Sequence, residues 1–466
     1  MTSRVVAAVD LGATSGRVVI GRIGDGRLDL ELVSRFPNGP VEREDGLHWD
    51  FGALYEHVVE GLVEAVRREP GIESIGIDSW AVDYGLLHDG ELLAEPFHYR
   101  DERSERGVDE VHAEAPFTEL YQRNGLQFLP FNTLYQYRVD SRIADADTAL
   151  LIPDLIAYLL TGSAVAERTN ASTTGLLGVA SGEWDAELAD RLGIPSGILP
   201  PLVDPGTEVG RLRPELAARI GKDLPVIAVG SHDTASAVVA VPLSTPDSAY
   251  ISCGTWGLVG VELTEPVLTD AAREANFTHE LGVDGRYRFL HNVTGLWLLS
   301  ETVRAWEAED GSSIDLPDLL AQAAAVEGAV PMFDANDASL SAPGDMPARI
   351  SALLGDDAPA SRAAFARAIV ESIAAAFADA VRTASALSGR EIDAIHLVGG
   401  GSLNRLLCQA TADRTGVPVL AGPVEATALG NVLVQFRAIG AAPATLEELR
   451  ALVAETHVPE RYDPRA

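Results

Sequence analysis

The stretch V-I-A-V-G-S-H-D-T-A-S-A-V-V-A-V, residues 226–241, is the part of the sequence around which the rest is interpreted. Its apolar start predicts a buried strand, the polar residues after Gly230 predict a tight turn, and the small residues that run to Pro242 predict a helix. This pattern places the carboxylate of Asp233 at a strand-to-helix junction. Taken alone, the stretch favours a helix cap, in which Asp233 or Ser231 accepts backbone N–H groups. The functional alternative is a general base that faces a cleft.

The chain of 466 residues carries a formal net charge of −34, from 35 basic and 69 acidic residues. Its length predicts two or more domains, each with its own core. A field of this sign repels nucleic acids and anionic membranes, which excludes both as partners, and it requires that a nucleotide site be built from backbone N–H groups and a cation. The only lysine is Lys222. A Walker-type P-loop and the strand lysine of protein kinases are therefore excluded.

The two cysteines, Cys253 and Cys408, lie outside any Cys/His cluster. This excludes a disulfide scaffold and a zinc site, and it fits a reducing compartment. The first residues lead straight into a strand without an apolar leader, and no apolar run has the length of a membrane span. We therefore expect a cytoplasmic protein. We also expect a monomer or a small homo-oligomer.

Residues 5–22 predict two strands joined by a turn of small residues. The turn consists of Gly12, Ala13, Thr14, Ser15 and Gly16. Its N–H groups and hydroxyls can surround phosphate oxygens, Asp10 before it can hold a hydrated magnesium ion, and Arg17 after it can approach a phosphate or a substrate. The alternative is a plain hairpin, in which Asp10 and Thr14 are turn residues.

Residues 75–87, I-G-I-D-S-W-A-V-D-Y-G-L-L, predict a strand, a polar-aromatic turn and a second strand. This turn suits a polyol or a sugar, because the Trp80 ring can cover C–H faces while Asp78 and Asp83 accept from hydroxyls. The alternative is a half-buried tryptophan beside solvated acids. The stretch H-Y-R-D-E-R, residues 98–103, is either a second sugar-contacting element or an internally paired turn.

After residue 241 the chain repeats its opening pattern, because A-Y-I-S-C-G-T-W-G-L-V-G-V at residues 249–261 again predicts two strands joined by a small polar turn. Two such hairpins indicate two similar domains that face each other across a cleft. Thr255 in the second turn is a further candidate phosphate contact, and Cys253 is interpreted as a small buried residue. Residues 364–387 predict a long alanine-rich helix, and residues 395–407 predict a strand, three glycines and a helix. The glycines leave room for a nucleotide, or they serve tight packing of the strand on the helix.

Together these motifs resemble the FGGY family of carbohydrate kinases, whose superfamily includes actin and chaperone ATPases. The resemblance is carried by V-D-L-G-A-T-S-G-R, G-I-D-S-W-A-V-D-Y, Q-F-L-P-F-N-T-L-Y-Q, S-H-D-T-A-S-A-V, S-C-G-T-W-G-L, H-L-V-G-G-G-S-L-N and A-G-P-V-E-A-T-A-L-G-N, which extend from residue 9 to residue 431. It implies an α/β fold with two ribonuclease-H-like domains around a central cleft. Residues 1–243 would form the N-terminal domain on the sugar side, and residues 244–466 the C-terminal domain on the nucleotide side.

The resemblance also implies an ATP-dependent kinase that uses Mg²⁺, and the motifs come nearest to the branch that phosphorylates the 1-hydroxyl of L-rhamnulose. Asp233 would be the base that takes the proton of this hydroxyl, and we expect the helix N-terminus to keep Asp233 ionised. The further sugar contacts would be Trp80, Ala81, Asp83, His232 and Thr234. The nucleotide contacts would be Ala13, Thr14, Ser15, Gly16, Arg17 and Thr255 at the phosphates, together with Asn292, Gly399, Gly400 and Gly401, with Asn292 near the base or ribose.

Two positions depart from that branch of the family. Ala81 stands where glycine is usual, so that its methyl group narrows the expected sugar pocket, and Ser300 stands where a glutamine is expected at a nucleotide contact. One alternative is therefore another ketose kinase of the family, acting on L-fuculose, L-xylulose or an unmodified ketohexose. The other is a non-catalytic nucleotide-dependent sensor or chaperone-like ATPase on the same fold, whose ATP hydrolysis would not depend on a sugar.

Overall fold

The computed structural model describes residues 3–24, 26–243 and 245–465. The chain packs into two compact units. The first consists of Met1–Pro242, Leu263–Phe289 and Ala426–Thr456, and the second of Leu243–Glu262, Leu290–Glu425 and His457–Ala466. A segment from near the end of the sequence thus packs with the first unit. The division into domains at residues 243 and 244 stays a prediction.

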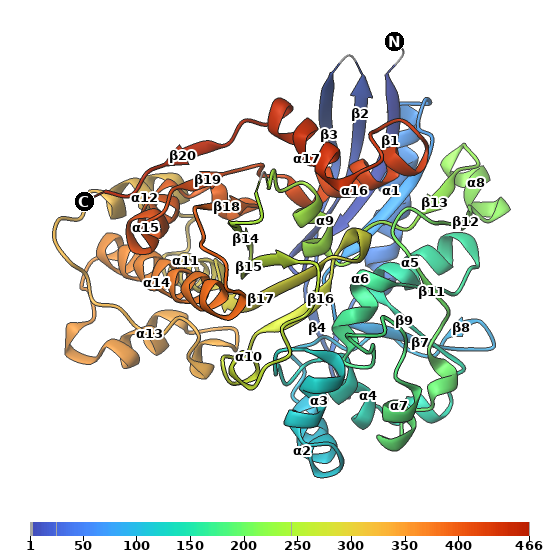
Figure 1. The fold of residues 1–466 in the computed structure, drawn as a ribbon, viewed down its shortest axis with the longest axis horizontal. Coiled ribbons are helices and arrows are strands. Elements are labelled where there is room, and N and C mark those ends of the chain that lie inside the picture. The colour runs from blue at the N-terminus through green and yellow to red at the C-terminus, as the bar shows by residue number, and fades with distance from the viewer. Residues whose placement is uncertain (1–2, 25, 244, 466) are drawn as a thin grey trace. The chain divides into compact units, whose positions relative to one another are not determined.

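The first unit is built on a six-stranded mixed sheet of order β12-β13-β6-β1-β2-β3 (Figure 1). Its strands are β1 (Arg4–Leu11), β2 (Ser15–Gly24), β3 (Arg27–Pro37), β6 (Ile75–Ser79), β12 (Glu208–Arg211) and β13 (Pro225–Ile227). Strand β1 is antiparallel to β2 and parallel to β6, and β6 is parallel to β13. The run V-V-A-A-V-D-L of β1 is buried throughout, as a central strand covered on both faces requires. The predicted hairpin of residues 5–22 is confirmed.

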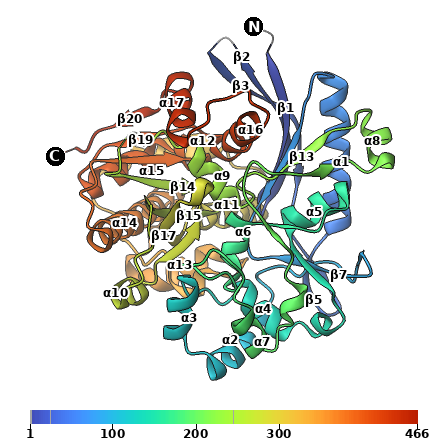
Figure 2. The same cartoon turned by 45° about the vertical axis from the view of Figure 1, so that its right-hand side comes forward.

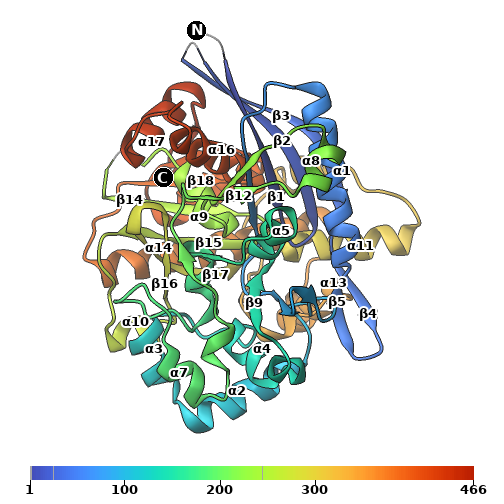
Figure 3. The ribbon, with the colours of Figure 1, turned by 90° about the vertical axis from the view of Figure 1, so that its right-hand side faces the viewer.

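The first unit also contains twelve α-helices among its described residues. They are α1 (Phe51–Arg68), α2 (Arg103–Glu114), α3 (Phe117–Asn124), α4 (Thr133–Val139), α5 (Ile152–Thr161), α6 (Arg168–Ala171), α7 (Ala186–Arg191), α8 (Pro214–Ile220), α9 (Asp233–Val239), α10 (Asp270–Glu274), α16 (Ala426–Ala438) and α17 (Leu446–Thr456). Helix α1 buries Leu54, Val58 and Leu62, which follow the spacing of one helix face. It approaches β2 closely, since a Cβ on Gly61 would lie 2.4 Å from Cγ2 of Val18. Figure 3 shows α8 beside the same helix.

Short strands complete the first unit. They are β4 (Pro40–Arg43) with β5 (Gly46–Trp49), then β7 (Tyr84–His88), β8 (Glu91–Leu92) and β9 (Thr148–Leu151), and β10 (Ala166–Glu167) with β11 (Leu202–Val203). Strands β6 and β7 confirm the strand, turn and strand predicted for residues 75–87.

Helices α9 and α16 pack almost backbone to backbone. A Cβ on Gly430 of α16 would lie 1.7 Å from the carbonyl oxygen of Ser236 in α9. Helix α16 also reaches the sheet, because the Gln435 amide donates to the Ala7 carbonyl at 3.0 Å and the Ser74 hydroxyl donates to Gln435 Oε1 at 2.7 Å. Figure 2 shows α16 and α17 beside the first three strands. The end of the chain therefore covers the centre of the first sheet.

The second sheet has the order β16-β17-β15-β14-β18-β19-β20. Its strands are β14 (Ser248–Cys253), β15 (Trp256–Leu263), β16 (Thr278–Leu281), β17 (Tyr287–Thr294), β18 (Ala394–Val398), β19 (Val419–Ala421) and β20 (Glu460–Tyr462). Strand β14 is antiparallel to β15 and parallel to β18, which is parallel to β19. This repeats the relation of β1 to β2, β6 and β13. The second predicted hairpin is confirmed, and the fold is α/β with two mixed sheets.

The helices of the second unit are α11 (Trp297–Asp310), α12 (Leu316–Ala324), α13 (Met346–Leu354), α14 (Arg362–Ser388) and α15 (Arg405–Thr415). Helix α14 confirms the helix predicted for residues 364–387. It begins where the Ser361 hydroxyl accepts the N–H of Ala364, and it ends at Gly389, whose φ of +71° is left-handed. Within residues 3–24, 26–243 and 245–465, none of the helices has the length and the apolar character that a membrane span requires.

We expect Gly430→Ala to lower the free energy of unfolding by about 1–3 kcal/mol or more, because its methyl group would collide with the Ser236 carbonyl. Gly52 offers a matched control in α1, since a Cβ there meets nothing within 4 Å. Gly52→Ala should be neutral or stabilise by up to about 1 kcal/mol. Denaturant unfolding followed by circular dichroism measures both changes. A Gly430→Ala protein as stable as the wild type would contradict the packing of α9 on α16.

Candidate active site

Helix α9 begins at Asp233, and neither proposed cap is found there. His232 occupies the cap position, with φ −75° and ψ 122°, and makes no side-chain cap hydrogen bond. Ser231 instead donates its N–H at 2.9 Å and its hydroxyl at 2.8 Å to Oε2 of Glu167. The Asp233 carboxylate accepts the hydroxyl of Thr234 at 3.1 Å and keeps 31% of its side-chain surface exposed. The capping interpretation is therefore wrong.

Three aspartates meet at the carboxyl end of the first sheet. Asp10 and Asp78 are register partners on the parallel strands β1 and β6. The next residue of β6, Ser79, forms a parallel bridge with His232, which precedes Asp233. In open α/β sheets, ligands bind at this edge, beyond the carboxyl ends of the strands. The structure thus places the proposed base and the proposed metal-contacting residue at an edge suited to a ligand.

The pKa values of two of these carboxyls, Asp233 and Asp78, are raised. Burial and the charge of Asp10 raise the pKa of Asp233, while His232 lowers it. Burial and Asp10 also raise the pKa of Asp78 well above its usual range, although the Asn431 amide donates to Asp78 Oδ2 at 2.6 Å. The expectation that the helix N-terminus keeps Asp233 ionised stays a prediction, since burial and the charge of Asp10 act against it. A carboxylate with a raised pKa accepts a proton more readily, as a general base must.

The turn between β1 and β2 is held by an ion pair. Arg17 donates from Nε at 2.9 Å and from Nη2 at 2.6 Å to Oδ2 of Asp10, its partner across the two strands. A Cβ on Gly16 would lie 2.2 Å from Cε2 of Phe36, so that packing requires this glycine. Thr14 is exposed at the tip of the turn, and Ala13 and Ser15 are half-buried beside it. The structure brings these residues together, and their contacts with phosphate and magnesium stay predictions.

Asp83 is fully buried, and its carboxylate accepts four hydrogen bonds. Oδ2 accepts from the indole N–H of Trp49 at 2.7 Å, from that of Trp80 at 3.0 Å and from the backbone N–H of Tyr99 at 3.2 Å. Oδ1 accepts from the Gln136 amide at 3.1 Å. Trp80 itself is only 6% exposed. The alternative of a half-buried tryptophan beside solvated acids is wrong, and sugar contacts of Trp80 and Asp83 stay predictions.

The turn before Asp83 is strained at Val82. Its φ of +68° is left-handed, which is rare for a β-branched residue. The N–H of Asp83 donates to the Ala81 carbonyl at 2.9 Å, so that three residues close a turn, and the Thr133 hydroxyl holds the Val82 carbonyl at 2.7 Å. Such strain persists only where the surroundings impose it, and it gathers at functional sites. Ala81, the position that departs from the family pattern, therefore lies in a fixed bend.

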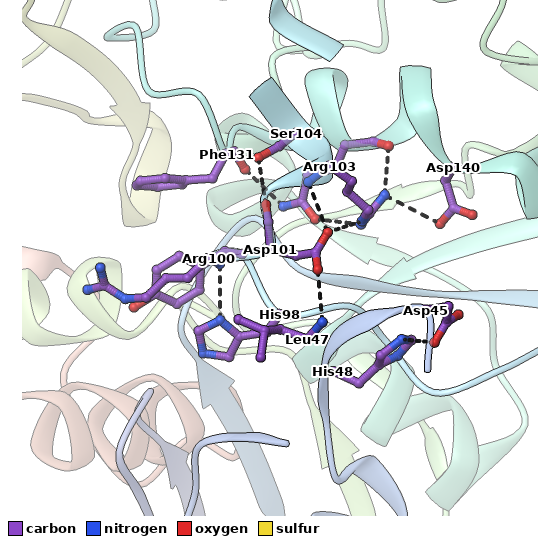
Figure 4. A network of polar contacts seen from close by, with 12 residues as sticks. Asp45, Leu47, His48, His98, Arg100, Asp101, Arg103, Ser104, Phe131 and Asp140 are labelled. Atoms are coloured by element: carbon purple, nitrogen blue, oxygen red, sulfur yellow. Dashed lines mark hydrogen bonds and ion pairs between the residues drawn. The ribbon is translucent and has the colours of Figure 1, made fainter. Parts of the chain in front are cut away.

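Figure 4 shows the polar network behind this turn. Asp101 accepts the backbone N–H groups of Leu47 at 2.8 Å and of Arg103 at 3.0 Å. The Arg103 guanidinium donates to the Gln136 carbonyl at 3.1 Å and to Gln136 Oε1 at 3.0 Å. Of the two interpretations of residues 98–103, the internally paired turn is confirmed at Asp101 and Arg103. Because Gln136 also donates to Asp83, the network fixes the buried carboxylate from behind.

The triple glycine of the second unit follows β18. A Cβ on Gly399 would lie 2.8 Å from the Cys253 carbonyl oxygen, and one on Gly401 would lie 2.3 Å from Cys253 Sγ. Packing therefore requires both glycines, but against the end of β14 and not, as the packing alternative had it, of the strand on the helix. A Cβ on Gly400 would meet nothing within 4 Å, so this glycine has open space beside it. Gly400 and Gly401 open a 3₁₀ turn, Gly400–Leu403, and α15 starts only at Arg405.

The remaining predicted nucleotide residues lie in the same unit. Thr255 occupies the turn between β14 and β15, and its carbonyl accepts the N–H of Trp297 at the start of α11 at 3.2 Å. Asn292 lies half-buried on β17. Cys253 is a small buried residue as predicted, and burial raises the pKa of its thiol. The nucleotide contacts of Thr255 and Asn292 stay predictions.

Three buried side chains beside the proposed base were missed. Glu167 holds Ser231, Asn431 holds Asp78, and the Arg288 guanidinium lies 3.0 Å from the ring nitrogen Nδ1 of His232. A weak signal for Glu167 exists in the sequence, because it opens the polar run E-R-T-N-A-S-T-T at residues 167–174. Asn431 ends the motif A-G-P-V-E-A-T-A-L-G-N, which gave no sign of its contact with Asp78, and Arg288 has no local signature.

Comparison with known proteins identifies two family models along the chain. Residues 5–240 match the N-terminal domain, and residues 249–439 the C-terminal domain, of the FGGY family of carbohydrate kinases. Among curated proteins, the chain is 42% identical to a protein named rhamnulokinase from Pectobacterium carotovorum, over 100% of this chain and 94% of that protein. It is 38% identical to a protein named rhamnulokinase from Bacteroides thetaiotaomicron, over 98% of this chain and 95% of that protein. It is 37% identical to one from Bacillus subtilis, over 93% of this chain and 90% of that protein.

Solved structures show the same fold at lower sequence identity. A gluconate kinase from Lactobacillus acidophilus aligns with a TM-score of 0.80 and 19% identity, over 100% of this chain and 94% of that one. A xylulose kinase from the same organism aligns with a TM-score of 0.81 and 19% identity, over 99% and 94%. At this identity the likeness concerns the fold alone.

We expect Asp83→Asn to lower the free energy of unfolding by about 1–3 kcal/mol, because the new amide turns a donor toward groups that themselves donate. Burial raises the pKa of Asp83 to about 6, above the ordinary value of about 3.9. The contribution of its titration to stability is therefore full below about pH 4 and is lost as the pH rises through about 6. The deficit of the variant, measured by urea unfolding, should be about 1 kcal/mol smaller at pH 7 than at pH 5. A deficit that grows over this range would contradict the raised pKa.

Proposed function

Because the chain belongs to the FGGY family of carbohydrate kinases, we propose that it transfers the γ-phosphoryl group of ATP to the 1-hydroxyl of L-rhamnulose, as a step of L-rhamnose breakdown. The products are L-rhamnulose 1-phosphate and ADP. The observation that carries this proposal is the similarity, over nearly its whole length, to several proteins named rhamnulokinase. The site in the first unit supports it with a carboxylate suited to act as a base.

In this reaction Asp233 takes the proton of the sugar hydroxyl while that oxygen forms a bond to the γ-phosphorus. The bond between this phosphorus and the oxygen that bridges it to the β-phosphate breaks, and ADP leaves. Phosphoryl transfer needs positioning and charge stabilisation more than covalent help from the protein. The raised pKa of Asp233 supports the assignment, since it brings the basicity of the carboxylate closer to the working pH.

The same proposal assigns the predicted contacts. The sugar would contact Trp80, Ala81, Asp83, His232 and Thr234, and the phosphates would contact residues 13–17 and Thr255. Asn292 and the triple glycine would bind the nucleotide, and the open space beside Gly400 makes it the glycine best suited to this contact. The matched family models, at residues 5–240 and 249–439, support residues 1–243 and 244–466 as the two domains.

The donor atoms at the carboxyl end of the first sheet fit a magnesium ion that is bound mainly through ATP. Within the described residues no group of three or more His, Cys, Asp or Glu side chains is placed to hold a metal ion. Oxygen donors are nevertheless present, since Asp10 lies there and the buried Oδ1 of Asp78 has no hydrogen-bond partner in the described part of the chain. Mg²⁺ usually keeps several waters and binds substrate phosphates, so we assign Asp10 a contact through water. The ion would offset the phosphate charge against the negative protein.

A second candidate function is the phosphorylation of another ketose, and the observation that favours it is Ala81. Its methyl group stands in the strained bend before Asp83, where the nearest branch of the family usually has glycine. One methyl group changes sugar preference by only about 1–3 kcal/mol, enough to shift the preferred ketose within the family.

The deciding experiment is ADP release from the purified protein with MgATP and a panel of L-rhamnulose, L-fuculose, L-xylulose, D-xylulose and L-fructose. A clear preference for L-rhamnulose supports the proposal, and a preference for another ketose supports the second candidate. ADP release that no sugar accelerates would reject both and favour a sensor or chaperone-like ATPase.

We expect Asp233→Asn to keep the fold and to lower sugar-dependent turnover by about 10²–10⁴-fold, because the amide cannot accept the hydroxyl proton. Asp109→Asn provides the matched control, since Asp109 is exposed on α2. Coupled measurement of ADP, together with circular dichroism, separates lost chemistry from lost structure. Near-normal turnover of a folded Asp233→Asn protein would refute the role of Asp233 as the base.

A further inference from the structure

A fully buried arginine lies beside the proposed base without a part in the proposed chemistry. Arg288, on β17, has no exposed surface. Its Nη1 lies 3.0 Å from Oε2 of Glu280 on β16, and its Nε donates to the Leu281 carbonyl at 3.2 Å. Glu280 is itself only 6% exposed. Because desolvation of two charges offsets much of their attraction, such a pair contributes little stability and is better explained by what it holds in place.

The pair holds the imidazole of His232. Arg288 Nη2 lies 3.0 Å from Nδ1 of this ring, and Glu280 Oε2 lies 3.2 Å from the same nitrogen. A guanidinium group can only donate hydrogen bonds, so Nδ1 must accept from Arg288 and carries no proton. A neutral imidazole then carries its proton on Nε2. Glu280 alone would select the opposite tautomer, because its carboxylate attracts a proton on Nδ1, and Arg288 therefore decides between the two.

The protonated nitrogen faces the base. Nε2 of His232 lies 3.3 Å from Oδ1 of Asp233, and the Thr234 hydroxyl donates to the same oxygen at 3.1 Å. Nε2 of His232 and the Thr234 hydroxyl thus both lie beside the same carboxylate oxygen, Oδ1. The other oxygen, Oδ2, is then the one that receives the proton of the substrate hydroxyl.

We propose that Arg288 is a positioning residue that imposes the Nε2–H tautomer on His232 and thereby orients the Asp233 carboxylate toward the substrate hydroxyl. The proposal rests on the proposed kinase function for its effect on turnover. The effect on the His232 ring does not depend on that function, because the contacts that produce it lie within the protein.

The direct test is the tautomer of His232, read from ¹⁵N–¹H correlation spectra of histidine-labelled protein, with the His232→Gln spectrum to assign the signal. The wild type should show the proton on Nε2. In Arg288→Met it should move to Nδ1, where Glu280 accepts it, and kcat should fall by about 10–100-fold while KM for ATP changes little. A wild-type ring protonated on Nδ1, or an unchanged tautomer and kcat in folded Arg288→Met, would overturn the proposal.

A rescue variant separates positioning from mere support of the fold. In Arg288→Met/Glu280→Gln the new amide can donate to Nδ1, so the Nε2–H tautomer and part of kcat should return. A purely structural role predicts a double variant no better than Arg288→Met, which would overturn the proposal. Arg138→Met is the matched control. Arg138 lies on α4, and the substitution breaks its ion pairs of 2.9 Å with Glu110 and of 2.9 Å with Glu114, both on α2. It should leave the tautomer and kcat within about 2-fold of wild type.

Arg288→Lys covers the case in which Arg288→Met does not fold. The lysine ammonium also only donates, so His232 should keep its Nε2–H tautomer, and a proton on Nδ1 in this variant would overturn the proposal. These experiments distinguish a wrong kinase function from a wrong role of Arg288. A wild type without sugar-dependent turnover rejects the kinase function, whereas an active wild type whose tautomer and kcat survive Arg288→Met rejects the role of Arg288.

Discussion

The burial of carboxylates at one end of a sheet is the constraint on which the first unit depends. A buried carboxylate must find donors or give up its charge. Asp83 finds four donors, Glu167 draws in Ser231 and Asp78 accepts from Asn431, and burial still raises the pKa of all three carboxyls. Since Ser231 lies two residues before Asp233, the tie to Glu167 also fixes where the proposed base stands. The site is thus shaped by how its neighbours satisfy their own hydrogen bonds.

Arginine suits this role in an otherwise acidic chain. Nearly all positive charge is on arginine, since the sequence has one lysine. A guanidinium group stays charged and only donates, so in a buried place it dictates the direction of its partners and does not titrate. Arg17 orients Asp10, Arg103 orients Gln136, and Arg288 faces His232. Asp10 and His232 are themselves candidate site residues, and Gln136 donates to the candidate site residue Asp83.

The local sequence pattern predicted the helices and strands, but it did not predict which carboxylates are buried or which residues donate to them. The hairpins of residues 5–22 and 249–261 and the helix of residues 364–387 depend on neighbouring residues, so apolar spacing was sufficient to find them. The same holds for the position of Asp233 at the start of a helix. Asp83 lies three residues after its donor Trp80, but its donors Trp49 and Gln136 come from other elements. The partner of Asp78 stands 353 positions away, beyond any local pattern.

The place of α16 in the chain sets an order of events during synthesis. Helix α16 supplies Asn431 and Gln435 to strands that the ribosome made first. The first unit therefore waits, after its residue 242, until residues 426–456 emerge, for roughly 10–40 s at a synthesis rate of about 5–20 residues per second. During this time one face of β1 and β6 is without its final cover. The nascent chain thus carries an unfinished core through most of its translation, and its earliest strands are among the last to be enclosed.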